Sequence, residues 1–138
     1  MNSLKNHLLI SVPHMNDDIF GRSVIYICEH NLEGAMGLII NKPMDDISFK
    51  DLKNVNHINS DRFQSLRMKL YFGGPILVEK IIALHTNELK IETAIPLNNK
   101  ISISSGKEII RDIENDINLN YKLFCGHSGW NPGQLERE

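Results

Sequence analysis

Two apolar, β-branched runs near the start of the chain constrain its fold more than any other feature. Residues 23–28 (Ser-Val-Ile-Tyr-Ile-Cys) and 36–40 (Met-Gly-Leu-Ile-Ile) have the composition of strands. The residues between them, 30–34, have the length and composition of a hairpin connection. Because both runs are continuous rather than alternating, they are typical of strands covered on both faces. The sequence therefore predicts an antiparallel hairpin in the middle of a sheet.

Shorter runs with strand composition occur elsewhere in the chain. They lie at 8–12, 67–72, 80–86, 90–95 and 121–125. Pro13 ends the first run, because proline donates no hydrogen bond to a neighbouring strand. Gly73, Gly74 and Pro75 predict a tight change of direction after the second. Residues 126–130 are rich in glycine, so we expect a loop there.

Two helices are predicted where a serine precedes an acidic residue by three positions, an arrangement that satisfies free backbone amides at a helix start. The pairs are Ser48 with Asp51 and Ser105 with Glu108. After the second pair, one helical face carries Ile109, Ile110, Ile113 and Ile117. The second helix is therefore the more strongly indicated of the two.

A third helix start is predicted close to the end of the chain. Asn131 has the position of a cap, Pro132 that of a first helical residue, and Gln134 that of a capping-box side chain. Only residues 135–138 follow, which is too short for a stable helix of two turns. We therefore expect the chain to lack the C-terminal part of its domain.

Length and charge limit the classes of protein to consider. A chain of 138 residues has room for one core, so residues 1–138 are predicted to form a single domain. The formal net charge is −2, from 15 basic and 17 acidic residues. This balance provides no positive field for a polyanion, so we predict no binding to nucleic acid or to an anionic membrane.

The cysteines and the N-terminus indicate the compartment. Cys28 and Cys125 are too few and too far apart for a disulfide framework, and they favour two free thiols in a reducing environment. The apolar stretch at 8–10 is much shorter than a signal peptide's apolar region or a membrane span. We therefore expect a cytoplasmic protein without a membrane segment.

The run at 20–30, followed by 34–43, resembles the bacterial YqgE/AlgH family. Gly73-Gly74-Pro75, Leu84-His85 and the segment 126–136 occur in the family's order, so the resemblance covers essentially the whole chain. It implies an α+β fold, with a mostly antiparallel, bifurcated sheet curled into a partial barrel and flanking helices. Family members continue well beyond this chain's last residue, and His127 stands where they usually have Tyr.

Four residues are candidates for catalysis: Glu29, His30, His85 and His127. If the hairpin forms, Glu29 and His30 lie near one end of the sheet, where a polar cleft would need a base of near-neutral pKa. The alternative is that Glu29, His30 and Asn41 satisfy the hairpin's own backbone groups. The sequence alone favours this second interpretation, because polar residues at turns are ordinary.

Four residues are candidates for binding: Arg22, Asn41, Trp130 and Gln134. For Arg22, the sequence favours pairing with Asp17 or Asp18 across a turn over a binding role, because polar residues at turns are ordinary. Trp130 is suited either to anchor a partner or to fix its loop to the core.

Metal and cofactor sites are not predicted. Cys28 and His30, with His85 and His127 far away in sequence, lack the spacing of a zinc site. Nucleophilic chemistry at Cys125 would need a neighbouring cation such as His127, but a buried, apolar role suits this thiol better.

Three functions remain open at this point. The leading hypothesis is a non-enzymatic binding or regulatory module with an unknown protein or small-molecule partner, because the family-like segments are rich in Gly, Pro and apolar strand residues. The first alternative is a small enzyme with a polar cleft near His30, His85 and His127. The second is a transcriptional regulator, which rests only on the label that some family members carry and is supported by neither charge nor a helix-turn-helix pattern. The family as a whole has no established activity.

Overall fold

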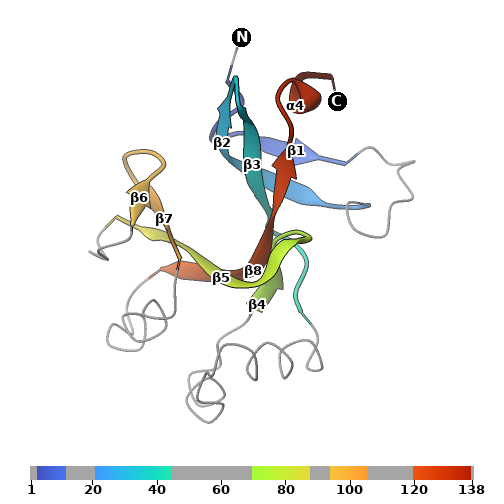
Figure 1. Cartoon of the computed structure of the whole chain (residues 1–138). Helices are drawn as coiled ribbons and strands as arrows, with labels where there is room; N and C mark the ends of the chain where they lie inside the picture. The colour runs from blue at the N-terminus through green and yellow to red at the C-terminus, as the bar shows by residue number, and fades with distance from the viewer. Residues whose placement is uncertain (1–2, 12–20, 45–69, 88–93, 106–119, 138) are drawn as a thin grey trace.

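One curled sheet forms the framework of the protein. A computed structural model describes residues 3–11, 21–44, 70–87, 94–105 and 120–137. Within them, strands follow the spatial order β1-β2-β3-β8-β5-β7-β6, and β4 pairs with β8 as well. The strands are β1 (Leu8–Ile10), β2 (Val24–Asn31), β3 (Gly34–Ile39), β4 (Leu70–Phe72), β5 (Ile76–Thr86), β6 (Ile95–Pro96), β7 (Ile101–Ser105) and β8 (Tyr121–Trp130). Figure 1 shows the sheet as a trough, with β2 and β3 on one side, β6 and β7 on the other, and β5 and β8 between them.

The predicted central hairpin is confirmed. β2 and β3 pair antiparallel, from Ile25 opposite Ile39 to Asn31 opposite Gly34. The strands reach further toward the turn than the sequence indicated, so only Leu32 and Glu33 connect them. β2 lies between β1 and β3, and β3 lies between β2 and β8, which makes both of them interior strands.

Both faces of this hairpin are covered, as the continuous apolar runs predicted. On the convex face, Ile25, Ile27 and Ile39 form a cluster with Leu135. On the concave face, Cys28 and Leu38 pack with Ile82, Leu97 and Phe124. A sheet with apolar side chains on both faces explains why the sequence does not alternate there.

The expected loop at 126–130 is wrong, because β8 continues without interruption to Trp130. Gly126 adopts a φ of 75°, which a residue without a side chain reaches without strain. A Cβ atom at Gly126 would also collide with the carbonyl oxygen of Gly74. Glycine therefore does not end this strand, and instead allows a bend and a close approach of two backbones.

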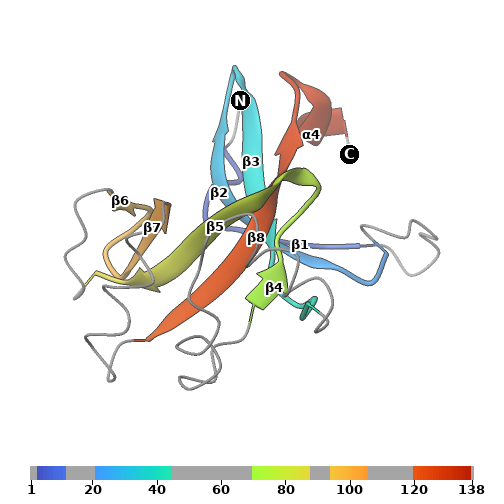
Figure 2. The same cartoon turned by 60° about the horizontal axis from the view of Figure 1, so that its bottom comes forward.

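The sheet divides at β8, in agreement with the bifurcation that the family resemblance implied. Along one edge, Leu123–Cys125 pair with β4 in parallel, and Ser128–Trp130 pair with β3 antiparallel. The other edge of β8 pairs antiparallel with β5. Figure 2 shows β4 and β5 on either side of β8. All the strand pairs apart from β4 and β8 are antiparallel within the described residues.

The other strand predictions agree in part. β1 and β4 form within the predicted runs, whose remaining residues at 12 and 67–69 lie outside the described residues. β5 begins at Ile76, earlier than expected, and most of the predicted run at 90–95 lies outside the described residues. β7 was not predicted, because its serines hide its strand character: Ser102 and Ser104 are buried there.

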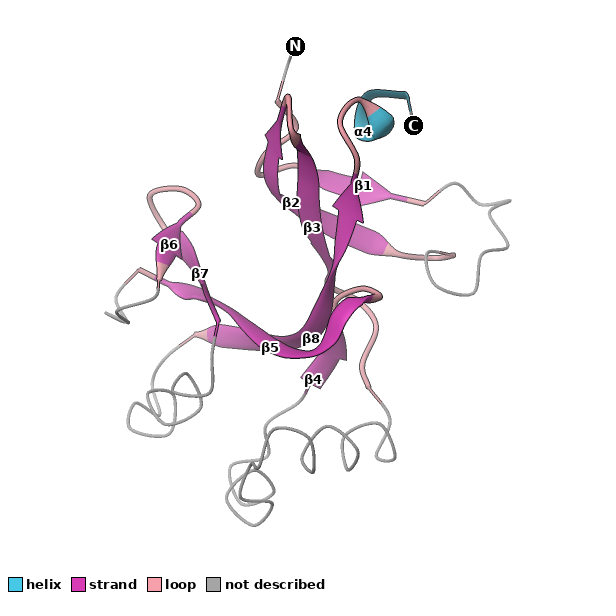
Figure 3. Ribbon diagram, viewed as in Figure 1, coloured by secondary structure: helices cyan, strands magenta, loops and turns pink. Residues whose placement is uncertain are grey.

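α4 (Gln134–Arg137) is the one helix among the described residues, and Figure 3 shows how strands dominate this part of the chain. The predicted start at Asn131 is confirmed, since Asn131 N–H donates to Gln134 Oε1 at 2.9 Å. Leu135 anchors α4 in the convex cluster. The predicted helices after Ser48 and Ser105 lie outside the described residues.

Side-chain hydrogen bonds join the two sides of the trough, namely the segment around β2 and the loop between β6 and β7. Asn6, which precedes β1, donates from its side chain to the carbonyl of Leu97 at 3.0 Å. Asn98 donates to Asn6 Oδ1 at 3.2 Å, and the Tyr26 hydroxyl donates to the same oxygen. The loop between β6 and β7 is thereby held near β2, although no strand pairing closes the sheet there within the described residues.

Candidate functional site

A pocket of about 280 Å³ lies on the concave side of the sheet, and we call it the concave pocket. Its apolar lining consists of Cys28, Met36, Leu77, Ile82, Ile95, Leu97 and Ile103. Its other lining residues are Glu29, Lys80, Ser104, Ser105 and His127. An apolar cavity with a few polar groups is the usual form of a small-molecule site, and this volume is near the lower end of the usual range.

A bulge in β2 places Glu29 in this pocket. Ile27 pairs with Gly37, and Glu29 pairs with the next residue, Met36, so Cys28 is an extra residue in β2. Cys28, Glu29 and Met36 then all line the concave pocket. Without the extra residue, strict alternation would direct Glu29 to the convex face.

The same bulge directs His30 to the convex face. His30 Nδ1 accepts a hydrogen bond from Leu4 N–H at 2.9 Å, so the ring proton is on Nε2, which donates to Glu136. The imidazole is buried, with both nitrogens engaged. His30 therefore connects the N-terminal segment, β2 and α4, and it does not reach the concave pocket.

A larger irregularity in β5 supplies the opposite side of the pocket. Ile76 pairs with His127 and Ile81 with Cys125, so four residues of β5 face a single residue of β8. Leu77 begins this segment with a φ of 49°, a left-handed conformation that is unusual for leucine. Leu77 and Lys80 from this segment both line the pocket.

His127 lies in the pocket as a partly buried, neutral imidazole. Burial lowers its pKa from 6.5, and the nearby charge of Lys80 lowers it further. At neutral pH the ring is therefore uncharged, and it offers a hydrogen-bond donor and an acceptor without adding charge.

His85 lies elsewhere. Its Nδ1–H donates to the carbonyl of Thr86 at 2.9 Å, and its Nε2 accepts from the Ser104 hydroxyl at 2.7 Å. The side chains of His85 and Ser104 are buried. Along β5 and β7 they alternate with Leu84 and Ile103, which pack on the concave face, so the side chains of His85 and Ser104 lie on the opposite face. The structure thus brings together Glu29 and His127 of the four catalytic candidates, and it separates His30 and His85 from them.

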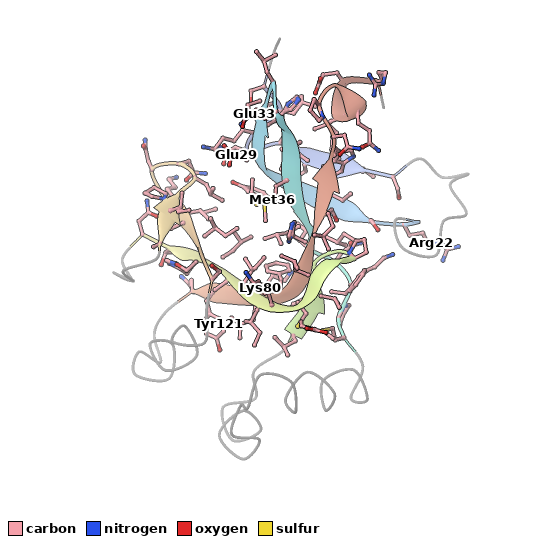
Figure 4. The ribbon with its side chains drawn as sticks, in the orientation of Figure 1. Arg22, Glu29, Glu33, Met36, Lys80 and Tyr121 are labelled. Atoms are coloured by element: carbon pink, nitrogen blue, oxygen red, sulfur yellow. The ribbon has the colours of Figure 1, made fainter. Side chains whose placement is uncertain are left out.

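Three of the four binding candidates have structural partners for their side chains. Asn41 accepts from Val24 N–H at 2.9 Å and donates to the carbonyl of Arg22 at 3.0 Å, which fits the interpretation that it satisfies the hairpin's backbone. Arg22 is exposed at the far end of the sheet from the pocket (Figure 4), and Asp17 and Asp18 lie outside the described residues. Trp130 packs in the convex cluster, and Gln134 caps α4.

Neither thiol is prepared for nucleophilic chemistry. Burial raises the pKa of Cys28 to about 12 and that of Cys125 to about 12. Both cysteines are free and buried. No group of three or more His, Cys, Asp or Glu side chains suited to a metal ion occurs in the described ranges.

Sequence reasoning missed the residues that give the pocket its shape, namely Met36, Leu77, Lys80 and Ile95. The two irregularities that direct Glu29 and Lys80 into the pocket leave no mark in the sequence. The apolar run at 76–78 was an available signal in the sequence, and its side chains are exposed in the structure.

The described residues thus define a curled, mostly antiparallel half-barrel with an apolar pocket on its concave side. The sequence matches the AlgH-like family over residues 8–138, and the chain belongs to this family. No activity is established for the family, and the concave pocket is the candidate functional site of this chain.

Similar proteins come from several bacteria. The chain is 38% identical over 140 residues to a UPF0301 protein of Proteus mirabilis, covering 99% of this chain and 75% of that one. It is 36% identical over 136 residues to a UPF0301 protein of Nitrosospira multiformis, covering 98% and 73%. The solution structure of the AlgH protein from Pseudomonas aeruginosa matches with a TM-score of 0.77 and 32% identity, covering 98% of this chain and 71% of that one. A crystal structure from Corynebacterium diphtheriae has a TM-score of 0.67 at 22% identity, covering 97% and 70%, and it supports the fold alone.

Proposed function

We propose that this chain is a non-enzymatic binding module whose concave pocket holds a small ligand with an apolar body. The observation that carries this proposal is the exposure of Leu77 and Ile95, which are 55% and 63% exposed while also lining an apolar pocket. Large apolar side chains gain free energy when they leave water, at about 25 cal/mol for each Å² buried. A ligand that enters the pocket covers both of them.

An enzymatic use of the same pocket has less support. His127 is the one imidazole among the described residues that line the pocket, and burial raises the pKa of the Cys28 thiol, another lining residue, to about 12. Glu29 also lines the pocket, but among the described residues it forms no hydrogen bond or ion pair with His127, so it does not orient the imidazole as a general base requires.

We also propose that the chain works in a reducing, cytoplasmic compartment. Cys28 and Cys125 are buried free thiols, as expected for a protein of a reducing compartment. Among the described residues, no helix has the length and apolar character needed to cross a bilayer.

The test is a titration followed by methyl NMR, with 4-methylpentan-1-ol as an uncharged probe. We expect saturable shifts at Met36, Ile82 and Ile103 on the concave face, and none at Ile25 or Ile39 on the convex face. The variant Met36→Trp fills the pocket and should abolish the shifts at Ile82 and Ile103. Leu32→Trp adds the same side chain at the exposed hairpin turn and is its matched control.

Shifts that do not saturate, or equal shifts on both faces, would overturn the proposal. They would mean that apolar molecules adsorb to the sheet without a defined site. Circular dichroism of both tryptophan variants establishes that each retains the fold.

A further inference from the structure

Lys80 and His127 come from the same irregular part of the sheet. Ile76 pairs with His127 and Ile81 with Cys125, so Lys80 lies just before the point where regular pairing of β5 and β8 resumes. Both Lys80 and His127 line the concave pocket. Their side chains are near enough to interact electrostatically, since the charge of Lys80 lowers the pKa of His127. This part of the pocket therefore combines a cation with a titratable ring.

The ammonium of Lys80 is available to a ligand. Among the described residues it forms no hydrogen bond or ion pair with another side chain. The Lys80 side chain is exposed, and its four-carbon stem allows the ammonium to move toward a bound molecule. One cation without a partner at an apolar pocket favours a ligand with one negative charge.

Glu29 also lines the pocket, but its position differs from that of Lys80. Its Oε1 accepts a hydrogen bond from the side chain of Asn31 at 3.3 Å, and Asn31 is not a lining residue. In the sheet, β3 and β8 separate the strand of Glu29 from β5. Figure 4 shows Glu29 on the wall formed by β2, and Lys80 at the base of the trough. Glu29 therefore has a protein partner near the hairpin turn and does not neutralise Lys80.

Apolar surface lies next to the ammonium of Lys80. Ile82 follows Lys80 by two residues on β5, so the two side chains leave the strand on the same face. Ile103, on the neighbouring strand β7, packs against the same concave cluster as Ile82. Both isoleucines line the pocket, whose volume of about 280 Å³ favours a molecule smaller than an average drug.

We propose that the ligand of the concave pocket is a short monocarboxylate with an uncharged, apolar body, whose carboxylate contacts Lys80 and whose body lies against Ile82 and Ile103. This assignment rests on the proposed binding function and names the class of ligand that the pocket selects.

Binding of such an anion should be linked to a proton on His127. A carboxylate beside Lys80 offsets the positive charge that acts on the imidazole, so the ring takes up a proton more readily in the complex than in the free protein. The other titratable residues that line the pocket are Cys28, Glu29 and Lys80. Of these four side-chain types, only histidine ordinarily changes charge between pH 5.5 and 7.5. The affinity for the anion should therefore rise as the pH falls through this range.

The test compares three probes with the same branched body by calorimetry and methyl NMR. The probes are 4-methylpentanoate, the uncharged 4-methylpentan-1-ol and the cationic 4-methylpentan-1-amine. At pH 7.5 we expect the carboxylate to bind about 3- to 5-fold more tightly than the alcohol, as one partly exposed charge contact allows, and the preference should decrease with added salt. At pH 5.5 the carboxylate should bind at least about 2-fold more tightly than at pH 7.5, whereas the affinity of the alcohol should not change.

Substitutions assign the two effects to their residues. Lys80→Gln should remove the preference for the carboxylate, and Lys100→Gln, which removes the same charge at an exposed position outside the pocket, should preserve it. His127→Gln should remove the rise in affinity at pH 5.5. His7→Gln replaces an exposed histidine outside the pocket and should preserve that rise.

Failure of this inference is distinct from failure of the proposed function. If the alcohol binds as tightly as the carboxylate and gives saturable shifts at Ile82 and Ile103, the pocket binds apolar molecules and the carboxylate assignment is overturned. Tighter binding of the amine would also overturn it, and would identify Glu29 as the group that selects the ligand. Equal effects of Lys80→Gln and Lys100→Gln would contradict a contact with Lys80. If no probe gives a saturable shift, both proposals are overturned.

Discussion

His127 gives the protein a pH dependence that can be predicted in sign. Its pKa in the folded state lies below 6.5, mainly because of burial. As the pH falls, the unfolded chain takes up this proton first, so the free energy of unfolding decreases below about pH 6.5 until the folded pKa is also passed. We expect His127→Gln to lose less stability than the wild type between about pH 7.5 and pH 5. Urea unfolding at both pH values measures the difference, and identical losses would contradict it.

The two thiols should be inert while the protein is folded. Burial raises the pKa of Cys28 and of Cys125 to about 12, so almost no thiolate is present at neutral pH. We expect the native protein to react with a disulfide reagent at least about 100-fold more slowly than the protein in guanidinium chloride. The measurement is absorbance of the released thiol at pH 8. Rapid release of one equivalent from the native protein would show an accessible cysteine.

At the scale of the element, Gly126 should be the least replaceable residue of β8. Its φ of 75° and the close carbonyl of Gly74 act together against any side chain. We expect Gly126→Ala to lower the free energy of unfolding by about 2–4 kcal/mol.

Gly133 provides the matched control, since its φ is 77° but a Cβ there would meet only the end of the flexible Arg137 side chain, at 3.1 Å. Gly133→Ala should cost about 1–2 kcal/mol, the conformational part alone. Denaturant unfolding of both variants gives the two values. Equal losses would mean that the contact with Gly74 is relieved by movement.

Local pattern predicts elements well where the pattern has one interpretation. The runs at 23–28 and 36–40 specified β2, β3 and their pairing, and Asn131 with Gln134 specified the start of α4. Glycine misled the prediction in β8, because the same residue type permits both loops and close strand contacts. The serines of β7 misled it as well, since their burial depends on partners such as His85 that are distant in sequence.

The candidate site was predictable only in part, and for a related reason. Glu29 and His30 are neighbours in sequence, but the bulge at Cys28 directs Glu29 to the concave pocket and His30 to Glu136. A one-residue change in strand pairing reverses the direction of every following side chain. Such a change is fixed by tertiary packing, which a single sequence does not reveal.

At the scale of the whole molecule, Asn6 should control how firmly the trough is closed. It bonds to Leu97, Asn98 and Tyr26 at once, and its φ is 69°. Asn6→Gly keeps this backbone conformation but removes the side-chain bonds. We expect a loss of about 1–2 kcal/mol and faster hydrogen exchange at Leu97 N–H, which donates to Ile101.

The control for this variant is Asn31→Ala, which removes an asparagine whose oxygen accepts from Glu33 N–H at the hairpin turn. Exchange at Leu97 should be unaffected by it. If Asn6→Gly also leaves Leu97 protected, then packing alone holds the β6–β7 loop in place.

The shared edge of β8 has a consequence for how the protein is made. The β2–β3 hairpin is complete once Ile39 has been synthesised, and β5 follows by Thr86, yet both must wait for β8, which begins only at Tyr121. During translation, the edges of β3 and β5 that later pair with β8 therefore emerge from the ribosome unpaired. Unpaired strand edges of this kind are prone to associate between chains. Pairing of both edges therefore depends on β8, the last of the described strands in chain order.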